Sequence, residues 1–207
     1  MPGLLQFPRK VAGYFFLDSS YEKYYTPQSW DSEYYRGHSL DSPKESDRYV
    51  AVCDLVRQYA DNGSILDAGC GEGLLEVKCR GLTSKIVGID YSHVAIAKAR
   101  MRNLQNCEFI CTDTRVFCSD RVFSVIVFNE SLYYIDRYLD CLRAMTFLLS
   151  NNGVFIVSMY DTRITRRIWH NLSHEFLVVS EMHIRNDITW TVRALRPSWN
   201  LPARQSS

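Results

Sequence analysis

The sequence of 207 residues predicts an α/β fold: a doubly wound, mostly parallel seven-stranded sheet with helices on both faces and an antiparallel C-terminal hairpin. Three observations predict this fold. Short apolar segments alternate with segments of helical periodicity from residue 64 to residue 173. The apolar segments are hydrophobic nearly throughout, as strands of a parallel sheet buried on both faces are. Two β-rich segments, 176–184 and 188–195, then follow with hairpin spacing between them.

The elements begin with a helix from Glu45, because apolar residues recur there at three- and four-residue spacing until Asp61-Asn-Gly63 stops it. Strands are expected at 64–69, 85–90, 107–113, 123–128 and 154–159, and helices at 72–81, 92–103, 134–149 and 163–173. The helix at 134–149 has the clearest apolar stripe. We expect Asn151-Asn-Gly153 to end it, with Gly153 as a left-handed cap.

The composition is that of a globular protein, with 46% apolar and 23% charged residues. We divide the chain into an N-terminal extension at 1–45, one α/β domain at 46–197 and a C-terminal tail at 198–207. Tyrosine is abundant, with 13 residues, and five of them lie in the extension between Tyr21 and Tyr35. The extension therefore differs in composition from the domain that follows it.

Charge and cysteine content limit the partners and the compartment. The net charge is only +1, from 24 basic and 23 acidic side chains, so the strongly basic surface typical of nucleic-acid binding is not expected. No apolar run approaches the roughly 20 residues that cross a bilayer. The seven cysteines are odd in number and contain no Cys-x-x-Cys pair. This usage predicts a reducing, cytoplasmic compartment and no metal site.

A glycine-rich loop follows the first strand and reads Asp67-Ala-Gly-Cys-Gly-Glu-Gly73. Glycines at such a place let the backbone approach a ligand and adopt a positive φ. The spacing differs from the Gly-x-Gly-x-x-Gly of dinucleotide binders, which seats a pyrophosphate. An acid two residues before the first glycine suits a ligand with an ammonium group, such as an amino-acid moiety. The alternative is that the loop is only a tight turn.

Acidic residues also end the next two strands. Asp90 lies 23 residues beyond Asp67, where a carboxylate can accept hydrogen bonds from both hydroxyls of a ribose. The alternative is that Asp90 caps the helix that Ser92 begins. Asp113 ends the third strand, where it can accept from an exocyclic adenine amine, or else it is a solvated turn residue.

With the glycine loop, Gly88-Ile-Asp90, Thr112-Asp113 and the strand from Phe123 to Glu130, residues 46–197 resemble a class I S-adenosylmethionine-dependent methyltransferase. The resemblance implies a Rossmann-like fold and S-adenosylmethionine as cofactor. It places Asp67 near the amino group of the cofactor, Asp90 on its ribose and Tyr91 beside its adenine. The cofactor-binding residues expected are Asp67, Gly69, Cys70, Gly71, Gly73, Asp90, Tyr91, Asp113, Thr114 and Asn129, with Tyr35 and Arg36 added from the extension.

The stretch Glu130-Ser-Leu-Tyr-Tyr134 resembles that of small-molecule methyltransferases, including the nodulation-factor N-methyltransferases. Ligands bind at the C-terminal ends of the strands in this fold, so Glu130 and Tyr133 are expected to face the methyl acceptor. Glu130 is the first candidate for a general base or acceptor-orienting group, the alternative being a cap of the following helix. His38 of the extension is a further candidate for proton transfer.

The extension is expected to fold over the cofactor as a lid, with Trp30, Tyr34, Tyr35 and Arg36 shaping the active site, or else to serve hydrophobic packing. The function expected is methyl transfer from S-adenosylmethionine to an N or O atom of a small molecule, such as a sugar or a natural-product intermediate. A protein or RNA methyltransferase and a non-catalytic cofactor-binding subunit stay open as alternatives. The partner expected is a small-molecule acceptor, without nucleic acid or membrane, and a homodimer is left open.

Overall fold

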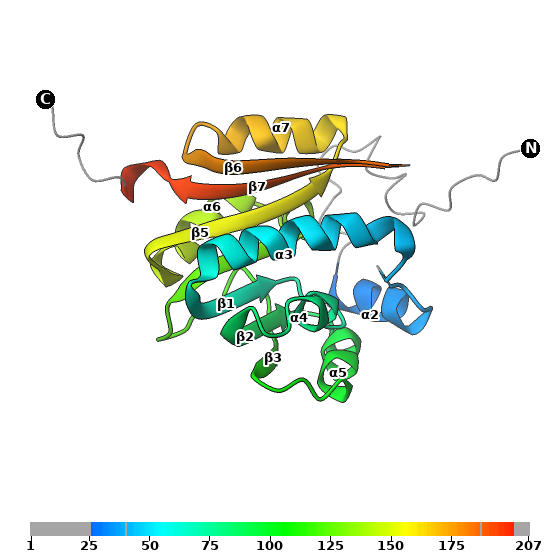
Figure 1. Cartoon of the computed structure of the whole chain (residues 1–207). Coiled ribbons are helices and arrows are strands. Elements are labelled where there is room, and N and C mark those ends of the chain that lie inside the picture. Colours follow the sequence, from blue (N-terminus) through cyan, green and yellow to red (C-terminus); the bar gives the residue numbers. More distant parts are fainter. Residues whose placement is uncertain (1–25, 40, 187, 201–207) are drawn as a thin grey trace, which may run out of the picture.

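Seven strands form one sheet in the order β3-β2-β1-β4-β5-β7-β6 (Figure 1). The structure is a computed structural model that describes residues 26–39, 41–186 and 188–200. The strands are β1 (Asn62–Ala68), β2 (Thr83–Asp90), β3 (Cys107–Cys111), β4 (Phe123–Asn129), β5 (Leu149–Tyr160), β6 (Phe176–Arg185) and β7 (Thr189–Pro197). β1 to β5 pair in parallel, whereas β7 runs antiparallel to β5 and β6. The predicted doubly wound sheet with a C-terminal hairpin is confirmed.

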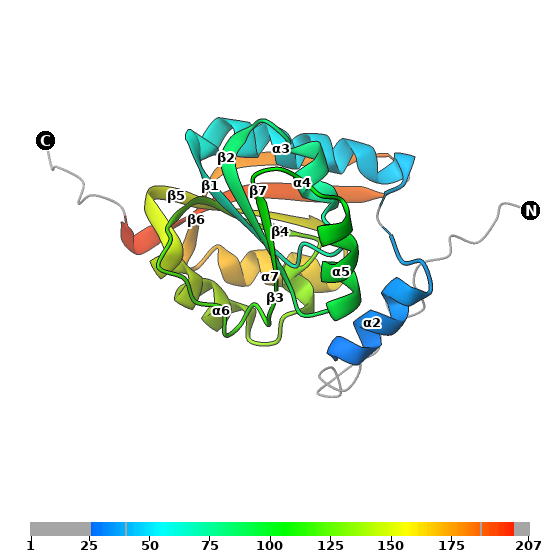
Figure 2. The ribbon, with the colours of Figure 1, turned by 90° about the horizontal axis from the view of Figure 1, so that it is seen from below.

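Helices cover both faces of the sheet, with α3 and α4 on one side and α6 and α7 on the other (Figure 2). The helices are α2 (Pro27–Tyr35), α3 (Ser46–Ala60), α4 (Leu74–Lys78), α5 (His93–Met101), α6 (Tyr138–Met145) and α7 (Arg163–Leu172), with 3₁₀ turns η2 (Pro43–Glu45), η3 (Leu132–Tyr134), η4 (Thr146–Leu148) and η5 (Ser198–Asn200). In β4, Val125 and Val127 pack toward α3, and Ile126 and Phe128 toward α6 and α7. Burial on both faces explains why this strand is apolar without interruption from Val125 to Phe128. None of the described helices is long and apolar enough to cross a membrane.

The order of the strands places the site. β1 lies between β2 and β4, with Asp67 opposite Gly88 on one side and Val127 on the other. The chain order therefore reverses beside β1, and the loops that leave β1 and β4 diverge to opposite faces. In open α/β sheets, this is where a ligand-binding crevice forms, at the carboxyl ends of the strands. Helix α2 stands at this edge of the sheet, beside α5 (Figure 1).

The helix predicted at 134–149 is wrong in extent, because the segment is divided among η3, α6 and η4. Helix α6 starts only after Arg137, which takes a left-handed φ of 52°. At its other end the Thr146 hydroxyl donates to the Leu142 carbonyl at 3.0 Å, and the chain tightens into η4 before β5 begins. Gly153 is therefore not a helix cap but a residue of β5. The pieces share one apolar stripe because all three pack on the same face of the sheet.

The helix predicted at 72–81 is also shorter than expected, since α4 spans only five residues. Gly73, with a φ of 78°, still belongs to the loop, and Gly81, with a φ of 80°, turns the chain toward β2. Both glycines lie in the left-handed region, which continues neither a helix nor a strand.

Candidate active site

A cavity of about 870 Å³ opens at the carboxyl edge of the sheet. Asp90, Tyr91 and Asp113 wall it where β2 and β3 end. Glu130 and Tyr160 wall it where β4 and β5 end. Its volume lies within the roughly 300–1,000 Å³ of small-molecule sites. The strand ends that the sequence singled out separately thus open into one space.

The glycine loop lies close to neighbouring side chains. Gly69 and Gly71 have φ values of 83° and 55°. A Cβ atom at Gly69 would stand 2.5 Å from the Cβ of Ser131, and one at Gly71 would stand 2.6 Å from the hydroxyl of Tyr34. Cys70 between them is buried, and burial raises the pKa of its thiol well above the usual range. No larger residue fits at either glycine without displacing a neighbour, so Ser131 and Tyr34 can pack directly against the loop backbone.

A second cavity of about 40 Å³ lies over this loop, and Asp67 and Tyr34 are among its walls. Asp67 is only 1% exposed, and its Oδ1 atom has no hydrogen-bond partner among the described residues. Burial, then the nearby carboxyls of Glu76 and Asp90, raise the pKa of Asp67 well above its usual range. A buried acid with an unmatched oxygen is suited to an ammonium ligand. The loop therefore fits the amino-acid moiety that the sequence predicted for it.

Asp90 joins this loop to the start of α5. Its Oδ2 atom accepts a hydrogen bond from the backbone N–H of Gly71 at 3.0 Å, and its Oδ1 atom accepts from that of Ser92 at 2.8 Å. Burial raises the pKa of Asp90 to about 6, although these two hydrogen bonds oppose the shift. The side-chain cap of α5 is Ser92, whose hydroxyl accepts from the N–H of Ala95 at 3.1 Å. Asp90 is left to face the cavity.

Tyr91, Asp113 and Thr114 also line the cavity. Arg115 holds Asp113, donating from its backbone N–H at 2.8 Å and from its guanidinium Nη2 at 2.6 Å. Burial tends to raise the pKa of Asp113, but these hydrogen bonds outweigh burial and lower it. Asp113 therefore combines the two alternatives, since it closes a turn and still presents a charged carboxylate to the cavity.

Glu130 follows β4 in a left-handed conformation with a φ of 59°. Such a backbone costs about 1–3 kcal/mol outside glycine, and strained residues of this kind cluster at functional sites. Its Oε2 atom accepts a hydrogen bond from the Tyr133 hydroxyl at 2.9 Å, and its Oε1 atom lies 3.4 Å from the Ser158 hydroxyl. Burial raises the pKa of Glu130 to about 7, against the attraction of nearby Arg48. A cavity-wall carboxyl that titrates near neutrality can take up a proton.

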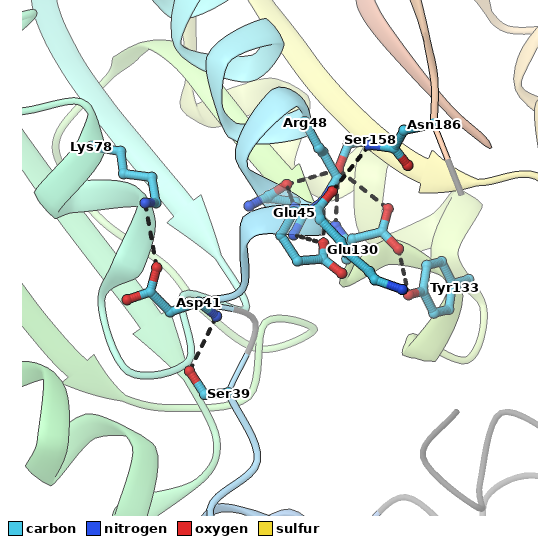
Figure 3. A network of polar contacts seen from close by, with 11 residues as sticks. Ser39, Asp41, Glu45, Arg48, Lys78, Glu130, Tyr133, Ser158 and Asn186 are labelled. Carbon is cyan, nitrogen blue, oxygen red and sulfur yellow. Dashed lines mark hydrogen bonds and ion pairs between the residues drawn. The ribbon is translucent and has the colours of Figure 1, made fainter. Parts of the chain in front are cut away.

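Behind Glu130 lies Arg48, a fully buried residue of α3 that sequence reasoning missed (Figure 3). It donates from Nε and Nη2 to Oε2 of Glu45 at 3.0 and 2.6 Å, and from Nη1 to Oδ1 of Asn129. Asn129 also accepts from the Ser158 hydroxyl at 2.8 Å. Within α3 no local pattern separates Arg48 from the exposed Arg57, because its partner Asn129 lies 81 residues further along the chain.

Three rings from the N-terminal segment pack at the cavity. The ring centre of Trp30 lies 5.0 Å from that of Tyr134 and 5.6 Å from that of His38, and Tyr34 lies 5.5 Å from His38. All four residues line the cavity, and burial lowers the pKa of His38. The predicted lid residues Trp30 and Tyr34 thus lie at the site together with the proton-transfer candidate His38. The first 25 residues lie outside the described residues.

Other predicted site residues lie apart from the cavity. The side chain of Tyr35 is 80% exposed and that of Arg36 is 76% exposed, and Arg36 pairs with Glu33 at 3.7 Å. Both point away because one face of α2, carrying Tyr34, is turned inward. Gly73 packs instead against Phe109, whose ring a Cβ atom would meet at 3.1 Å. In the described part of the chain, no three His, Cys, Asp or Glu side chains are grouped to hold a metal ion.

Comparison with known proteins identifies the family of this chain. A family model described as a methyltransferase domain matches residues 45–196. Malonyl-[acyl-carrier protein] O-methyltransferase of Bacillus anthracis is 30% identical over 111 residues, which are 51% of this chain and 41% of that protein. Nodulation protein S of Bradyrhizobium diazoefficiens is 23% identical over 139 residues, 65% of this chain and 66% of that protein. The chain thus spans less than two thirds of the length of these curated relatives.

The fold is shared with solved structures. The N-methyltransferase NodS from Bradyrhizobium japonicum WM9, crystallised with S-adenosyl-L-homocysteine, superposes with a TM-score of 0.66 at 20% identity. The superposition covers 77% of this chain and 90% of that one. At this identity the likeness concerns the arrangement of the sheet and its helices.

Proposed function

Since this chain belongs to the family of methyltransferase domains, we propose that it transfers a methyl group to an N or O atom of a small molecule, such as a sugar or a natural-product intermediate. S-adenosylmethionine is the cofactor that membership of this family implies. One observation carries the proposal: Gly69 and Asp90, from the cofactor motifs, line the same cavity as Glu130 and Tyr133. The cavity has the size of a small-molecule or cofactor site.

The residues at the first strand ends would hold the cofactor. Asp67 would accept from its amino group, Asp90 from its ribose hydroxyls and Asp113 from its adenine amine. Their burial or fixed hydrogen bonding keeps these carboxyls in place before any ligand binds. Gly69, Gly71, Cys70, Tyr91, Thr114 and Asn129 complete this part of the proposed site.

When bound, S-adenosylmethionine supplies a methyl group that its sulfonium already activates. The residues of the chain then have to orient an acceptor and accept its proton. Glu130 is our candidate for this base, since it lines the cavity and has a pKa of about 7. Tyr133 would position the carboxyl of Glu130 through their hydrogen bond at 2.9 Å. His38 is the second candidate for proton transfer, supported by its place in the cavity wall.

We also propose that residues 1–45 act as a lid on the domain at 46–197, with 198–207 as a tail. The position of α2 at the cavity supports the lid. We propose a cytoplasmic location, which the seven free thiols support, since structural disulfides are rare in reducing compartments.

A homodimer is supported by the edge strand β6, where Leu177 and Val178 are 41% and 44% exposed. Light scattering tests it: a mass twice that of the chain is expected, and a monomeric mass contradicts it.

Calorimetric titration with S-adenosylhomocysteine tests the proposed cofactor site. We expect the wild-type chain to bind and Asp90→Ala to lose about 1–3 kcal/mol of binding free energy, the usual loss for charge-assisted hydrogen bonds. Asp120→Ala, at an exposed aspartate outside the cavity, serves as the matched control and should bind like the wild type. Absence of binding by the wild-type chain would refute the proposed function.

A further inference from the structure

The cavity has a second end, beyond the residues that we assign to the cofactor. We call it the acceptor end and define it by Glu45, Glu130, Asp136, Tyr133, Tyr160 and Trp190. These side chains come from segments far apart in sequence: η2, the segment 130–136 that contains η3, and the strands β5 and β7. The set consists of three acids and three aromatic residues. An acceptor bound at this end would therefore meet carboxyl groups and aromatic rings.

The acceptor end is acidic and has no lysine or arginine in its wall. Among the described residues that line the whole cavity, Arg115 is the one such cation, and it bonds Asp113 at the opposite end. Arg48 lies behind the wall with no exposed surface, bonded to Glu45 (Figure 3) and to Asn129. Its charge offsets that of Glu45, so the acidic character of this end rests on Glu130 and Asp136. An anionic acceptor would lose its water here without gaining a cation, which is costly.

The arginines that follow β5 do not supply that cation. Arg163, Arg166 and Arg167 of α7 are exposed and do not line the cavity. Arg166 donates to both carboxylate oxygens of Asp161 at 2.6 Å. These arginines form a solvated helix face, so the acidic character of the acceptor end is not offset by this patch.

Trp190 is 1% exposed and faces the guanidinium of Arg48 at 6.0 Å, so Tyr133 and Tyr160 are the rings that would meet a cation at the acceptor end. The ring centre of Tyr133 lies 5.6 Å from that of Tyr160, at an interplanar angle of 82°, and 4.4 Å from that of Tyr134. The faces of such rings attract ammonium groups, and aromatic cages with nearby carboxylates bind them in many proteins. Glu130 stands beside these rings and holds its carboxyl toward Tyr133. The acidic side chains and the aromatic rings therefore both favour a ligand that carries an ammonium group.

From this juxtaposition we infer that the acceptor of the reaction is an amine, which enters the acceptor end as an ammonium ion beside Glu130. This inference rests on the proposed function and narrows it from an N or O acceptor to nitrogen. The ammonium ion gives one proton to the carboxylate of Glu130. The lone pair so freed forms the new N–C bond, while the electron pair of the broken C–S bond stays on sulfur, which becomes a neutral thioether. The methylated product is again an ammonium ion, and Glu130 later returns its proton to water.

Binding to the full chain saturated with S-adenosylhomocysteine tests the inference. The probes are three pools of fragments matched in size: primary amines, carboxylates and neutral alcohols, followed by saturation-transfer NMR. We expect binders in the amine pool, and we expect Glu130→Gln to weaken them about tenfold or more, as loss of a charged partner does. With methyl-labelled S-adenosylmethionine, the label should appear on nitrogen of the bound amines.

A charge reversal keeps the test decisive if Glu130→Gln fails to fold. Asp136 is exposed at the cavity rim, so Asp136→Lys leaves the core intact. Asp136→Lys should weaken the binding of amines and strengthen the binding of carboxylates. Asp120→Lys, which makes the same charge change outside the cavity, should change neither affinity. The inference would be overturned if the wild type bound no amine, or bound carboxylates or alcohols as well as amines or better. It would also be overturned if Asp136→Lys left the affinity for amines unchanged. Failure to bind S-adenosylhomocysteine would instead refute the proposed function.

Discussion

The carboxylate of Asp31 accepts a hydrogen bond of 2.5 Å from the hydroxyl of Ser92, two residues beyond Asp90. Its Oδ1 atom also accepts from the backbone N–H of Val94 at 3.1 Å. One acid of α2 thereby satisfies donors at the start of α5, and Lys98 of α5 returns a bond of 2.8 Å to the carbonyl of Tyr34. These contacts hold the N-terminal helix against the strand end that we assign to the cofactor.

We predict that Asp31→Ala releases α2 from α5, because both donors lose their acceptor. Amide hydrogen exchange over residues 27–35 should become faster, and S-adenosylhomocysteine should bind several-fold more weakly. Asp31→Asn, which keeps one oxygen acceptor, should show a smaller effect, and Asp120→Ala none. Unchanged exchange in α2 after Asp31→Ala would show that these hydrogen bonds do not hold the helix.

A pair of glycine substitutions separates backbone strain from steric blocking. Gly71 and Gly81 have φ values of 55° and 80°, so alanine at either should cost about 1–2 kcal/mol of unfolding free energy. Only at Gly71 does a Cβ atom meet a neighbour, the Tyr34 hydroxyl at 2.6 Å, while Gly81 has open space within 4 Å. We expect Gly71→Ala to abolish S-adenosylhomocysteine binding and Gly81→Ala to preserve it. Similar affinities in calorimetry would remove Gly71 from the proposed cofactor site.

Arg48 and Arg57 allow a matched test of the buried network, since each pairs with an acid three residues earlier in the chain. Arg48 is fully buried and also holds Asn129, whereas the side chain of Arg57 is 61% exposed. Arg48→Met should lower the unfolding free energy by about 3–5 kcal/mol, because Glu45 is left without its partner. Arg57→Met should cost less than about 1 kcal/mol. Equal urea midpoints for the two variants would contradict the structural role given to Arg48.

Glu76 makes stability depend on pH. It is 1% exposed, its carboxyl oxygens have no hydrogen bond to another described residue, and burial raises its pKa from 4.5 to about 8. The unfolded chain loses this proton above about pH 4.5 while the folded chain keeps it. Stability should therefore fall as pH rises from about 4.5 to 8, by about 1.4 kcal/mol per pH unit from this group.

Glu76→Gln should remove that slope, so that the variant matches the wild type near pH 4 and exceeds it near pH 8 in urea unfolding. Glu108→Gln is the control of opposite sign. Arg121 and Lys85 lower the pKa of Glu108 at the surface, so its small contribution is lost as pH falls. A Glu76→Gln variant that keeps the wild-type pH slope would show that Glu76 is ionised in the folded chain.

Local patterns predicted the elements that depend on neighbours in sequence. The apolar strands from Ser64 onward, the glycine loop at Gly69 and the terminal hairpin were predicted because β periodicity and turn chemistry act over a few residues. The same patterns failed at 134–149, where η3, α6 and η4 share one stripe. Periodicity records which face is buried, and it does not record the left-handed turn at Arg137 that interrupts the helix.

The sequence by itself determined the doubly wound sheet and the order of its acidic strand ends. It also determined the family to which the chain belongs. Only the tertiary structure decided which residues meet. It turned Tyr34 rather than Tyr35 toward the cavity, and it used Gly73 for packing against Phe109. It also buried Arg48 against Asn129 and Glu45, and so placed a fixed cation near Glu130. The reason is physical: side-chain partners across the fold are chosen by packing between distant segments, and no local spacing encodes that choice.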